Sequence, residues 1–139
     1  MALLNPINHI LSDFIQLLNS DKDRPCNALD YIAEDVALPT LQIVDITDDL
    51  EGQLYKDGLY NSTVTFVVRS NQQGKQQSVE IINWAITKLF NAKRDDGFKK
   101  MRLLTLEPAG FNFGQELSAA NELLQILTQS LRIHFTIKK

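Results

Sequence analysis

The sequence predicts an α+β fold: a mainly antiparallel sheet of about four strands with two amphipathic helices packed on one face. Two segments repeat apolar residues at helical spacing, and four others are β-branched or alternate apolar with polar residues. These elements follow in the order α-β-β-α-β-β, and helices laid on one face of the sheet bury every apolar stripe. The 139 residues fit one domain, residues 1–139.

The first helix is predicted to begin after Asn5 and to end at about Asn19. Asn5 is a good N-cap, and Pro6 occupies the first helical position, where its missing N–H costs nothing. The segment 26–36 that follows is ambiguous between a short helix and an irregular piece. The apolar face of the helix comprises Ile7, Ile10, Leu11, Phe14, Leu17 and Leu18.

Two strands joined by a long loop are expected next. "TLQIVDIT", after Pro39, and "STVTFVVR" are apolar runs rich in β-branched residues. The stretch between them carries Gly52 and an Asp57-Gly58 pair, and both are residue types typical of turns. An extended hairpin is therefore expected. Alternation in the second run puts three apolar residues on one face: Val64, Phe66 and Val68.

The second helix is predicted over residues 75–92. The segment "NAKRDDG" ends it, with basic residues in the last turn and Gly97 beyond. Its predicted buried stripe comprises Val79, Ile82, Ala85, Ile86, Leu89 and Phe90.

The C-terminal third is expected to hold two strands. "KMRLLTLE" forms the first, which stops at Pro108, and "AGFNFG" forms a loop. Residues 116–129 fit either a helix or a strand. Because no Gly or Pro separates them from the alternating tail "SLRIHFTIKK", one long final strand from about Leu124 is favoured.

Composition excludes several classes of protein. The net charge is −3, which argues against a protein whose main task is to neutralise nucleic-acid phosphates. The apolar runs are too short for a membrane span, and "MALLNPINHI" lacks the basic start of a signal peptide. The single Cys26 has no disulfide partner within the chain, which suits the cytosol.

The Gly74-Lys75 pair, between a strand and a helix, invites comparison with a phosphate-binding P-loop. The first glycine of that motif falls on Arg69, and the hydroxyl residue that holds magnesium falls on Gln76. An arginine cannot adopt the tight glycine turn, and a glutamine amide is a poor magnesium ligand. The pair is therefore interpreted as part of a solvated loop.

The other residues capable of chemistry do not form a site. His9 and His134 lack a cysteine or histidine at ligand spacing, and nothing places a histidine base beside Cys26. The acidic cluster at residues 45–51 lacks the glycine of a calcium loop, since its sixth position is Leu50. We therefore expect no catalytic, cofactor or metal site, and no enzyme. The loop phenylalanines Phe111 and Phe113 either complete the core or contact another chain.

The order of these parts resembles the lambda-type tail terminator proteins, which cap the tail tubes of long-tailed bacteriophages. The matching segments are "LPTLQIVDIT", "NSTVTFVVRSNQQGKQQSVEIINWAITKLF" and "SLRIHFTIKK", and the resemblance spans about residues 3–138. It lies in the pattern of elements rather than in an invariant motif. The clear departure is "FGQELSAANELLQI", which is longer than expected before the last strand.

The resemblance implies a mechanical function in the virion, reached after assembly in the host cytoplasm. Copies would form a ring, a hexamer in this family, that ends tube polymerisation and offers a docking surface to the head or neck. The implied partners are further copies, the tail tube protein and a head–tail connector or neck protein, with DNA only as passing cargo and no membrane. The proposed tube or lumen contacts are Asp48, Asp49, Glu51, Leu54 and Tyr55, and the proposed contacts to a subunit or neighbouring ring are Phe111 and Phe113.

Three other interpretations remain open at this stage. A head-completion or neck connector protein of the same machinery is also a small mixed fold. A nucleotide binder using Gly74-Lys75 would be stabilised by ATP, and a monomeric host adaptor would stay a single 15.8 kDa species at all concentrations.

Overall fold

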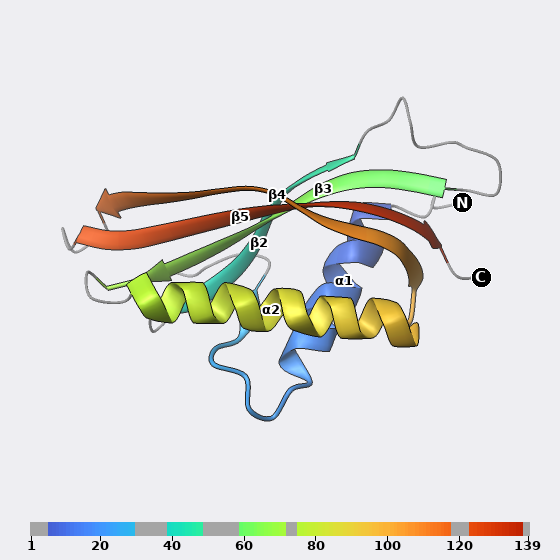
Figure 1. Cartoon of the computed structure of the whole chain (residues 1–139), viewed down its shortest axis with the longest axis horizontal. Helices are drawn as coiled ribbons and strands as arrows, with labels where there is room; N and C mark the ends of the chain where they lie inside the picture. The colour runs from blue at the N-terminus through green and yellow to red at the C-terminus, as the bar shows by residue number, and fades with distance from the viewer. Residues whose placement is uncertain (1–5, 30–38, 49–58, 72–74, 118–122, 138–139) are drawn as a thin grey trace.

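The computed structural model describes residues 6–29, 39–48, 59–71, 75–117 and 123–137. It confirms the α+β class, and in the described residues it contains one strand more than expected (Figure 1). That extra strand, β1, is very short and falls in the segment that the sequence left ambiguous. The elements are α1 (Pro6–Asn19), β1 (Ala28–Leu29), β2 (Thr40–Asp48), β3 (Leu59–Ser70), α2 (Lys75–Asp95), β4 (Met101–Leu117) and β5 (Leu123–Ile137).

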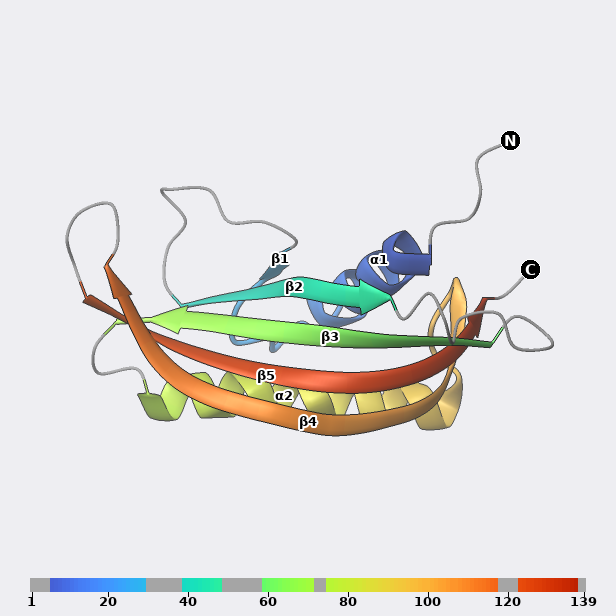
Figure 2. The same ribbon diagram turned by 90° about the horizontal axis from the view of Figure 1, so that it is seen from above.

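The strands form one sheet in the order β1-β2-β3-β5-β4. Only β1 and β2 run parallel to each other, and every other neighbouring pair is antiparallel. Both helices lie on the same face of the sheet, as predicted (Figure 1). Seen from above, α1 and β1 lie toward one side of the molecule and β4 lies on the other, with α2 between them (Figure 2).

The face of the sheet that meets the helices carries the core. Val64 of β3 is paired with Leu131 of β5, and Val68 with Leu127, and all four side chains are buried. The predicted inward face of β3 is thus confirmed, because Val64, Phe66 and Val68 are fully buried. Alternation along each strand then puts mainly polar side chains on the opposite, helix-free face.

Helix α1 is held to the sheet by an aromatic cluster. The ring of Phe14, which is fully buried, lies 6.4 Å from the ring of Phe66 in an edge-on contact and 5.5 Å from that of Phe98. At the end of the helix, the Asn19 side chain donates to the carbonyl of Ala28 and accepts from its N–H, at 3.0 and 2.8 Å. These two bonds place β1 beside α1.

Helix α2 is longer than predicted and is rotated about its axis relative to the predicted stripe. Val79 and Phe90 are exposed (39% and 40%), whereas Ile81, absent from that stripe, is fully buried. The reason is that α2 packs against α1 as well as the sheet, so its buried arc extends toward α1. The helix continues past Ala92 to Asp95, and Asp96 then adopts a left-handed conformation with φ of 51°.

Strand β4 does not stop at Pro108, contrary to the prediction, and "AGFNFG" belongs to the strand rather than to a loop. Pro108 is tolerated because β4 is at the edge of the sheet. An edge strand has a hydrogen-bonded neighbour on one side only, so the N–H that proline lacks is not needed to bond a second neighbouring strand. The register shifts between Pro108 and Phe111, which accommodates the change. The final strand begins at Leu123, close to the predicted Leu124, and the described residues of 116–129 are strand.

A carboxylate after α1 joins the two helices. Asp21 Oδ2 accepts from the indole N–H of Trp84 at 2.7 Å and lies 3.3 Å from Lys88 Nζ, while Oδ1 accepts from the N–H of Asp23. The Trp84 hydrogen bond is the main cause that lowers the pKa of Asp21 below its usual value, followed by the Asp23 N–H, with Lys88 adding less.

Replacing Trp84 by phenylalanine is expected to weaken the pH dependence of unfolding over the range in which Asp21 titrates, because the largest interaction that lowers its pKa is lost while those with the Asp23 N–H and Lys88 remain. A carboxylate whose folded-state pKa is lowered adds stability above its unfolded pKa, about 3.9, and loses it as the pH falls through the folded-state value. The variant should therefore be less stable than the wild type at neutral pH, with a gap that narrows in acid. Urea unfolding across that pH range measures the gap, and a gap that stays constant would contradict this role for Asp21.

Candidate functional site

The outer edge of β4 is the most prominent free surface in the described part of the chain. β4 pairs with β5 on one side only, and no described strand pairs with its other side, although the N–H of its first residue, Met101, donates to Asp13 of α1. Two of its apolar side chains are exposed, Leu104 at 42% and Phe111 at 65%. An unpaired edge that also exposes apolar side chains is a surface to which another polypeptide can bind.

One flank of α2 continues this surface. At 100° per residue, Val79 and Phe90 lie on nearly the same side of the helix and roughly opposite Trp84 and Lys88, which face Asp21 beside α1. The flank remote from α1 is the one on the β4 side (Figure 2). Every exposed large apolar residue of the described chain therefore lies in β4 or on this flank of α2. We call these four residues the β4 flank: Val79, Phe90, Leu104 and Phe111.

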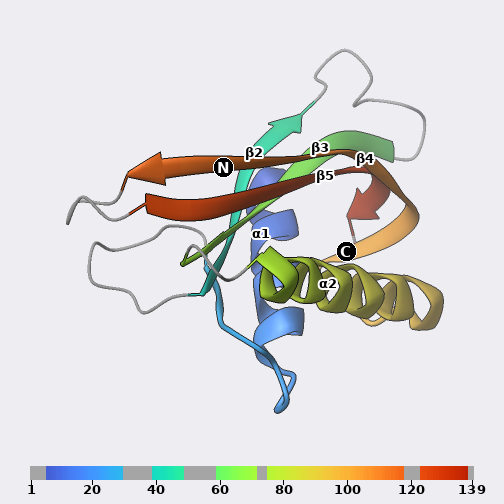
Figure 3. The same cartoon turned by 60° about the vertical axis from the view of Figure 1, so that its left-hand side comes forward.

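The two predicted contact phenylalanines have different environments. Their rings lie 5.9 Å apart and nearly perpendicular. Phe113, paired with Leu127, packs against the core and so partly completes it, whereas Phe111 stays exposed. The far ends of β4 and β5 extend past the N-terminal end of α2, so the helix gives little cover there (Figure 3). Of the two residues, Phe111 is the one available for contact.

On the opposite face of the sheet, side-chain hydrogen bonds connect several strands. Arg69 of β3 donates from Nε to Glu116 of β4 at 2.7 Å and from a terminal nitrogen to Gln42 of β2 at 2.8 Å. On the same face, Thr105 and His134 are hydrogen-bonded at 2.6 Å. His134 is thus held in a hydrogen-bonded pair with Thr105, and it belongs to no group of three potential metal ligands among the described residues.

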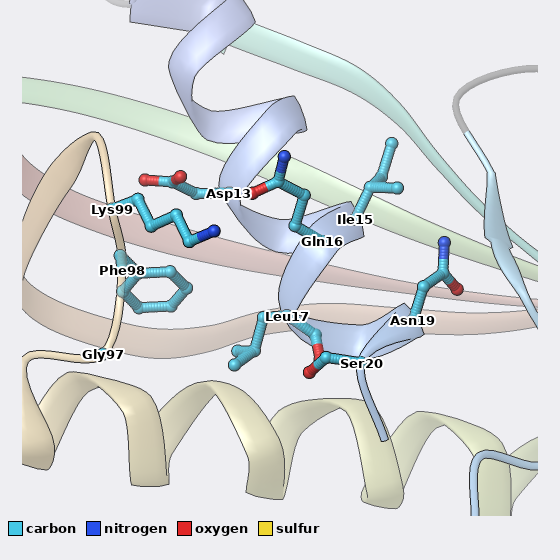
Figure 4. A pocket seen from close by; sticks show the side chains of 9 residues that line it. All are labelled: Asp13, Ile15, Gln16, Leu17, Asn19, Ser20, Gly97, Phe98 and Lys99. Carbon is cyan, nitrogen blue, oxygen red and sulfur yellow. The ribbon is translucent and has the colours of Figure 1, made fainter. Parts of the chain in front are cut away.

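A groove of about 490 Å³ lies between α1 and the turn that precedes β4 (Figure 4). Its one carboxylate, Asp13, is 3% exposed, and Oδ2 accepts from the backbone N–H groups of Lys100 at 2.8 Å and Met101 at 3.0 Å. A carboxylate already holding two backbone donors is positioned for structure rather than for acid–base chemistry. The residues that line the groove are Asp13, Ile15, Gln16, Leu17, Asn19, Ser20, Gly97, Phe98 and Lys99.

The environment of Cys26, the one cysteine of the chain, disfavours the thiolate form. Burial raises the pKa of the Cys26 thiol to about 11, although the backbone of Leu41 opposes the shift, so the thiol stays protonated at neutral pH. No group of three potential metal ligands occurs among the described residues. Neither described helix is long and apolar enough to span a membrane.

Several predicted residues fall where the structure gives no detail. Asp49, Glu51, Leu54 and Tyr55 lie outside the described residues. Asp48 is the last residue of β2, where its backbone pairs with Ser62. Gly74 also lies outside the described residues, His9 lies in α1, and Lys75 is the first residue of α2.

Comparison with known proteins gives a structural match only. No protein-family model matches the sequence, and no curated protein matches it. Seventeen chains of solved structures match the fold. One belongs to the virion of a native gene transfer agent (GTA) particle, with a TM-score of 0.56 and 12% sequence identity. The match covers 95% of this chain and 99% of that chain, so the two share one fold from end to end.

Proposed function

We propose that this chain is a structural protein of a phage-like virion and that copies of it form a ring that caps the tail tube. The observation that carries the proposal is the shared fold with a chain of a gene transfer agent virion, which extends over nearly the whole of both chains. A one-domain chain of that size in a virion fits a repeated structural subunit. The order of elements in the sequence supports the narrower assignment to a tail terminator.

The sheet supplies surfaces suited to a ring. Its two edges lie on opposite sides of the molecule, so a contact between unlike edges is head-to-tail and closes into a ring when the rotation between subunits allows it. One domain of this length has a radius of gyration of roughly 14 Å and cannot surround a DNA duplex by itself. A ring can, and we propose a hexamer, as in the family that the sequence resembles.

The proposed activity involves neither catalysis nor a cofactor. The ring would end polymerisation of the tail tube protein and present a docking surface to the head or neck protein, at the head-proximal end of the tail. DNA would only pass through it. The net charge of −3 per chain favours this, because an acidic lumen repels passing DNA rather than holding it.

The contact to the tube or lumen is assigned to the segment between β2 and β3. This segment follows Asp48 at the end of β2, and the contact residues assigned within it are Asp49, Glu51, Leu54 and Tyr55. The contact between subunits or to a neighbouring ring is assigned to Phe111, with Phe113 behind it in the partly buried position.

Replacing both Leu54 and Tyr55 by serine is expected to produce tails of uncontrolled length, because the ring would lose its apolar contacts with the tube. Tail lengths measured by negative-stain electron microscopy test this. The control replaces Asn83 and Thr87, two exposed residues of α2, by serine and should leave tail length unchanged. Tails of normal length in the Leu54/Tyr55 variant would contradict the assignment of this segment.

The neck connector is the alternative within the same machinery, and the fold match supports it equally. The two roles differ in the first partner bound. A terminator binds purified tail tubes without heads, whereas a neck protein binds portal-bearing heads without tails.

A further inference from the structure

We propose that residues 110–114 of the β4 edge pair antiparallel with the same residues of a second copy, about a two-fold axis at Asn112. The sequence of this segment, "GFNFG", reads the same in both directions. An isologous contact of this kind joins two copies and then stops, so it gives a dimer of the free chain rather than a ring. The inference goes beyond the proposed function and does not depend on it.

The symmetric order of the residues selects the partner. Antiparallel pairing about Asn112 puts Phe111 opposite Phe113 of the second copy, and Gly110 opposite its Gly114. Within one chain the rings of Phe111 and Phe113 already lie 5.9 Å apart and nearly perpendicular. Residues that face each other across a strand pair lie on the same side of the sheet, so the two symmetric pairs form one cluster of four rings in edge-on contact.

The backbone of β4 presents the hydrogen-bonding groups that this register needs. The carbonyl of Asn112 accepts from the hydroxyl of Thr128 in β5 at 3.4 Å, so it points toward β5. Because the N–H and C=O groups of successive strand residues point alternately to the two sides, those of Phe111 and Phe113 point outward. In the proposed register Phe111 exchanges both N–H···O bonds with Phe113 of the second copy, and the symmetric pair does the same.

The described part of the chain leaves this segment accessible. Phe111 is the most exposed residue of the β4 flank, and Asn112 and Gly114 are exposed as well. A Cβ added at Gly110 or Gly114 would meet no atom within 4 Å, so packing within one chain requires neither glycine. Glycine inside a strand often marks the close approach of another backbone. The ends of β4 and β5 extend past the N-terminal end of α2, which leaves a second copy access to this edge (Figure 3).

The charges permit this pairing of two like edges. Residues 108–115 carry no charged side chain, and Glu107 and Glu116 flank them. In the proposed register Glu116 faces Pro108 of the second copy and Glu107 faces its Leu117, so no like charges lie opposite each other. Pro108 lacks an N–H and precedes a register shift, so the pairing ends there and stays short.

The dimer uses a residue that the proposed ring also needs. The proposed function assigns Phe111 to a contact between subunits or to a neighbouring ring, and the dimer buries the same side chain. A copy within the dimer therefore cannot make that ring contact. Where the proposed function holds, the dimer must dissociate before the ring contact forms.

Oxidative cross-linking tests the register in the full-length chain with Cys26 replaced by alanine. Asn112 faces itself across the two-fold axis in a pair without backbone hydrogen bonds, whose Cα atoms lie about 4.5 Å apart. That separation suits a disulfide, so Asn112→Cys is expected to give a covalent dimer on oxidation, seen by non-reducing gel electrophoresis. Gln115→Cys is the matched control. It is another exposed residue of β4, but its two copies lie roughly 20 Å apart in this register and should not cross-link.

Sedimentation velocity from micromolar to millimolar concentration measures the association without a cross-link. The wild-type chain should form a dimer of 2 × 15.8 kDa. Phe111→Ser is expected to weaken the dimer by about tenfold or more, because each of the two aromatic pairs loses a ring. Phe90→Ser, at an exposed phenylalanine of α2, should associate like the wild type. Far-ultraviolet circular dichroism verifies that each variant is folded.

The outcomes separate this contact from the proposed function. A wild type that stays monomeric at millimolar concentration, equal cross-linking of the two cysteine variants, or a Phe111→Ser variant that associates normally would overturn the contact. If Asn112→Cys cross-links selectively while the wild type leaves tail tubes uncapped, the contact stands and the terminator function fails. If the wild type caps tubes although Asn112→Cys does not cross-link, the function stands and the contact is wrong.

Discussion

Replacing Phe14 by alanine is expected to lower the free energy of unfolding by about 3–5 kcal/mol. Phe14 is fully buried and its ring contacts both Phe66 in the sheet and Phe98 in the turn before β4. The substitution leaves a cavity where α1, the sheet and that turn meet, and only partial collapse can fill it. Urea unfolding monitored by circular dichroism gives the change in free energy, with an unchanged m-value indicating a two-state comparison.

The same substitution at Phe111 is the matched control. Phe111 is 65% exposed, so its replacement by alanine should change the free energy of unfolding by no more than about 0.5 kcal/mol. Equal losses at the two positions would contradict the packing described for α1.

Replacing Asp13 by alanine is expected to lower the free energy of unfolding by about 2–4 kcal/mol. Oδ2 of this buried carboxylate accepts from the N–H groups of Lys100 and Met101, which begin β4. Its removal leaves these donors without their acceptor, and the buried Met101 N–H has little access to water as a substitute. Urea unfolding measures the loss.

Two variants separate this hydrogen bonding from the loss of a negative charge. Asp13→Asn keeps an acceptor oxygen for both N–H groups and should lose less stability than the alanine variant. Asp23→Ala removes an exposed carboxylate and should stay within about 0.5 kcal/mol of the wild type. An Asp13→Ala variant as stable as Asp23→Ala would show that these bonds add nothing to the free energy of unfolding.

The elements with strong local signals were predictable from the sequence. The N-cap and proline at the start of α1, and the alternation in β5, led to bounds close to those observed. The predicted inward face of β3 was also correct, because alternation fixes which residues share a face. These features depend only on neighbouring residues, which is why periodicity finds them.

The features that depend on neighbours in space were missed. The rotation of α2 that buries Ile81 and exposes Phe90 follows from its contact with α1, which no local pattern encodes. The two-residue β1 is too short for any periodicity. Pro108 was taken as the end of a strand, although a proline inside a strand also fits an edge strand, and that signal pointed to the edge position of β4.

The candidate site was predicted in part. The sequence singled out Phe111 as a possible contact, and the structure leaves it exposed on the edge strand. Leu104 was not singled out, and Val79 and Phe90 were wrongly predicted to be buried, because their exposure depends on the strand order and on the rotation of α2. The proposed tube-contact residues 49–55 remain a prediction, since they lie outside the described residues.

The length of tails assembled with and without this chain tests the central claim most directly. In negative-stain images, particles that lack it should show tubes of variable, extended length that are not joined to heads, and adding the purified protein should place a ring at one end of each tube. Tails of uniform length joined to heads in its absence would contradict the account.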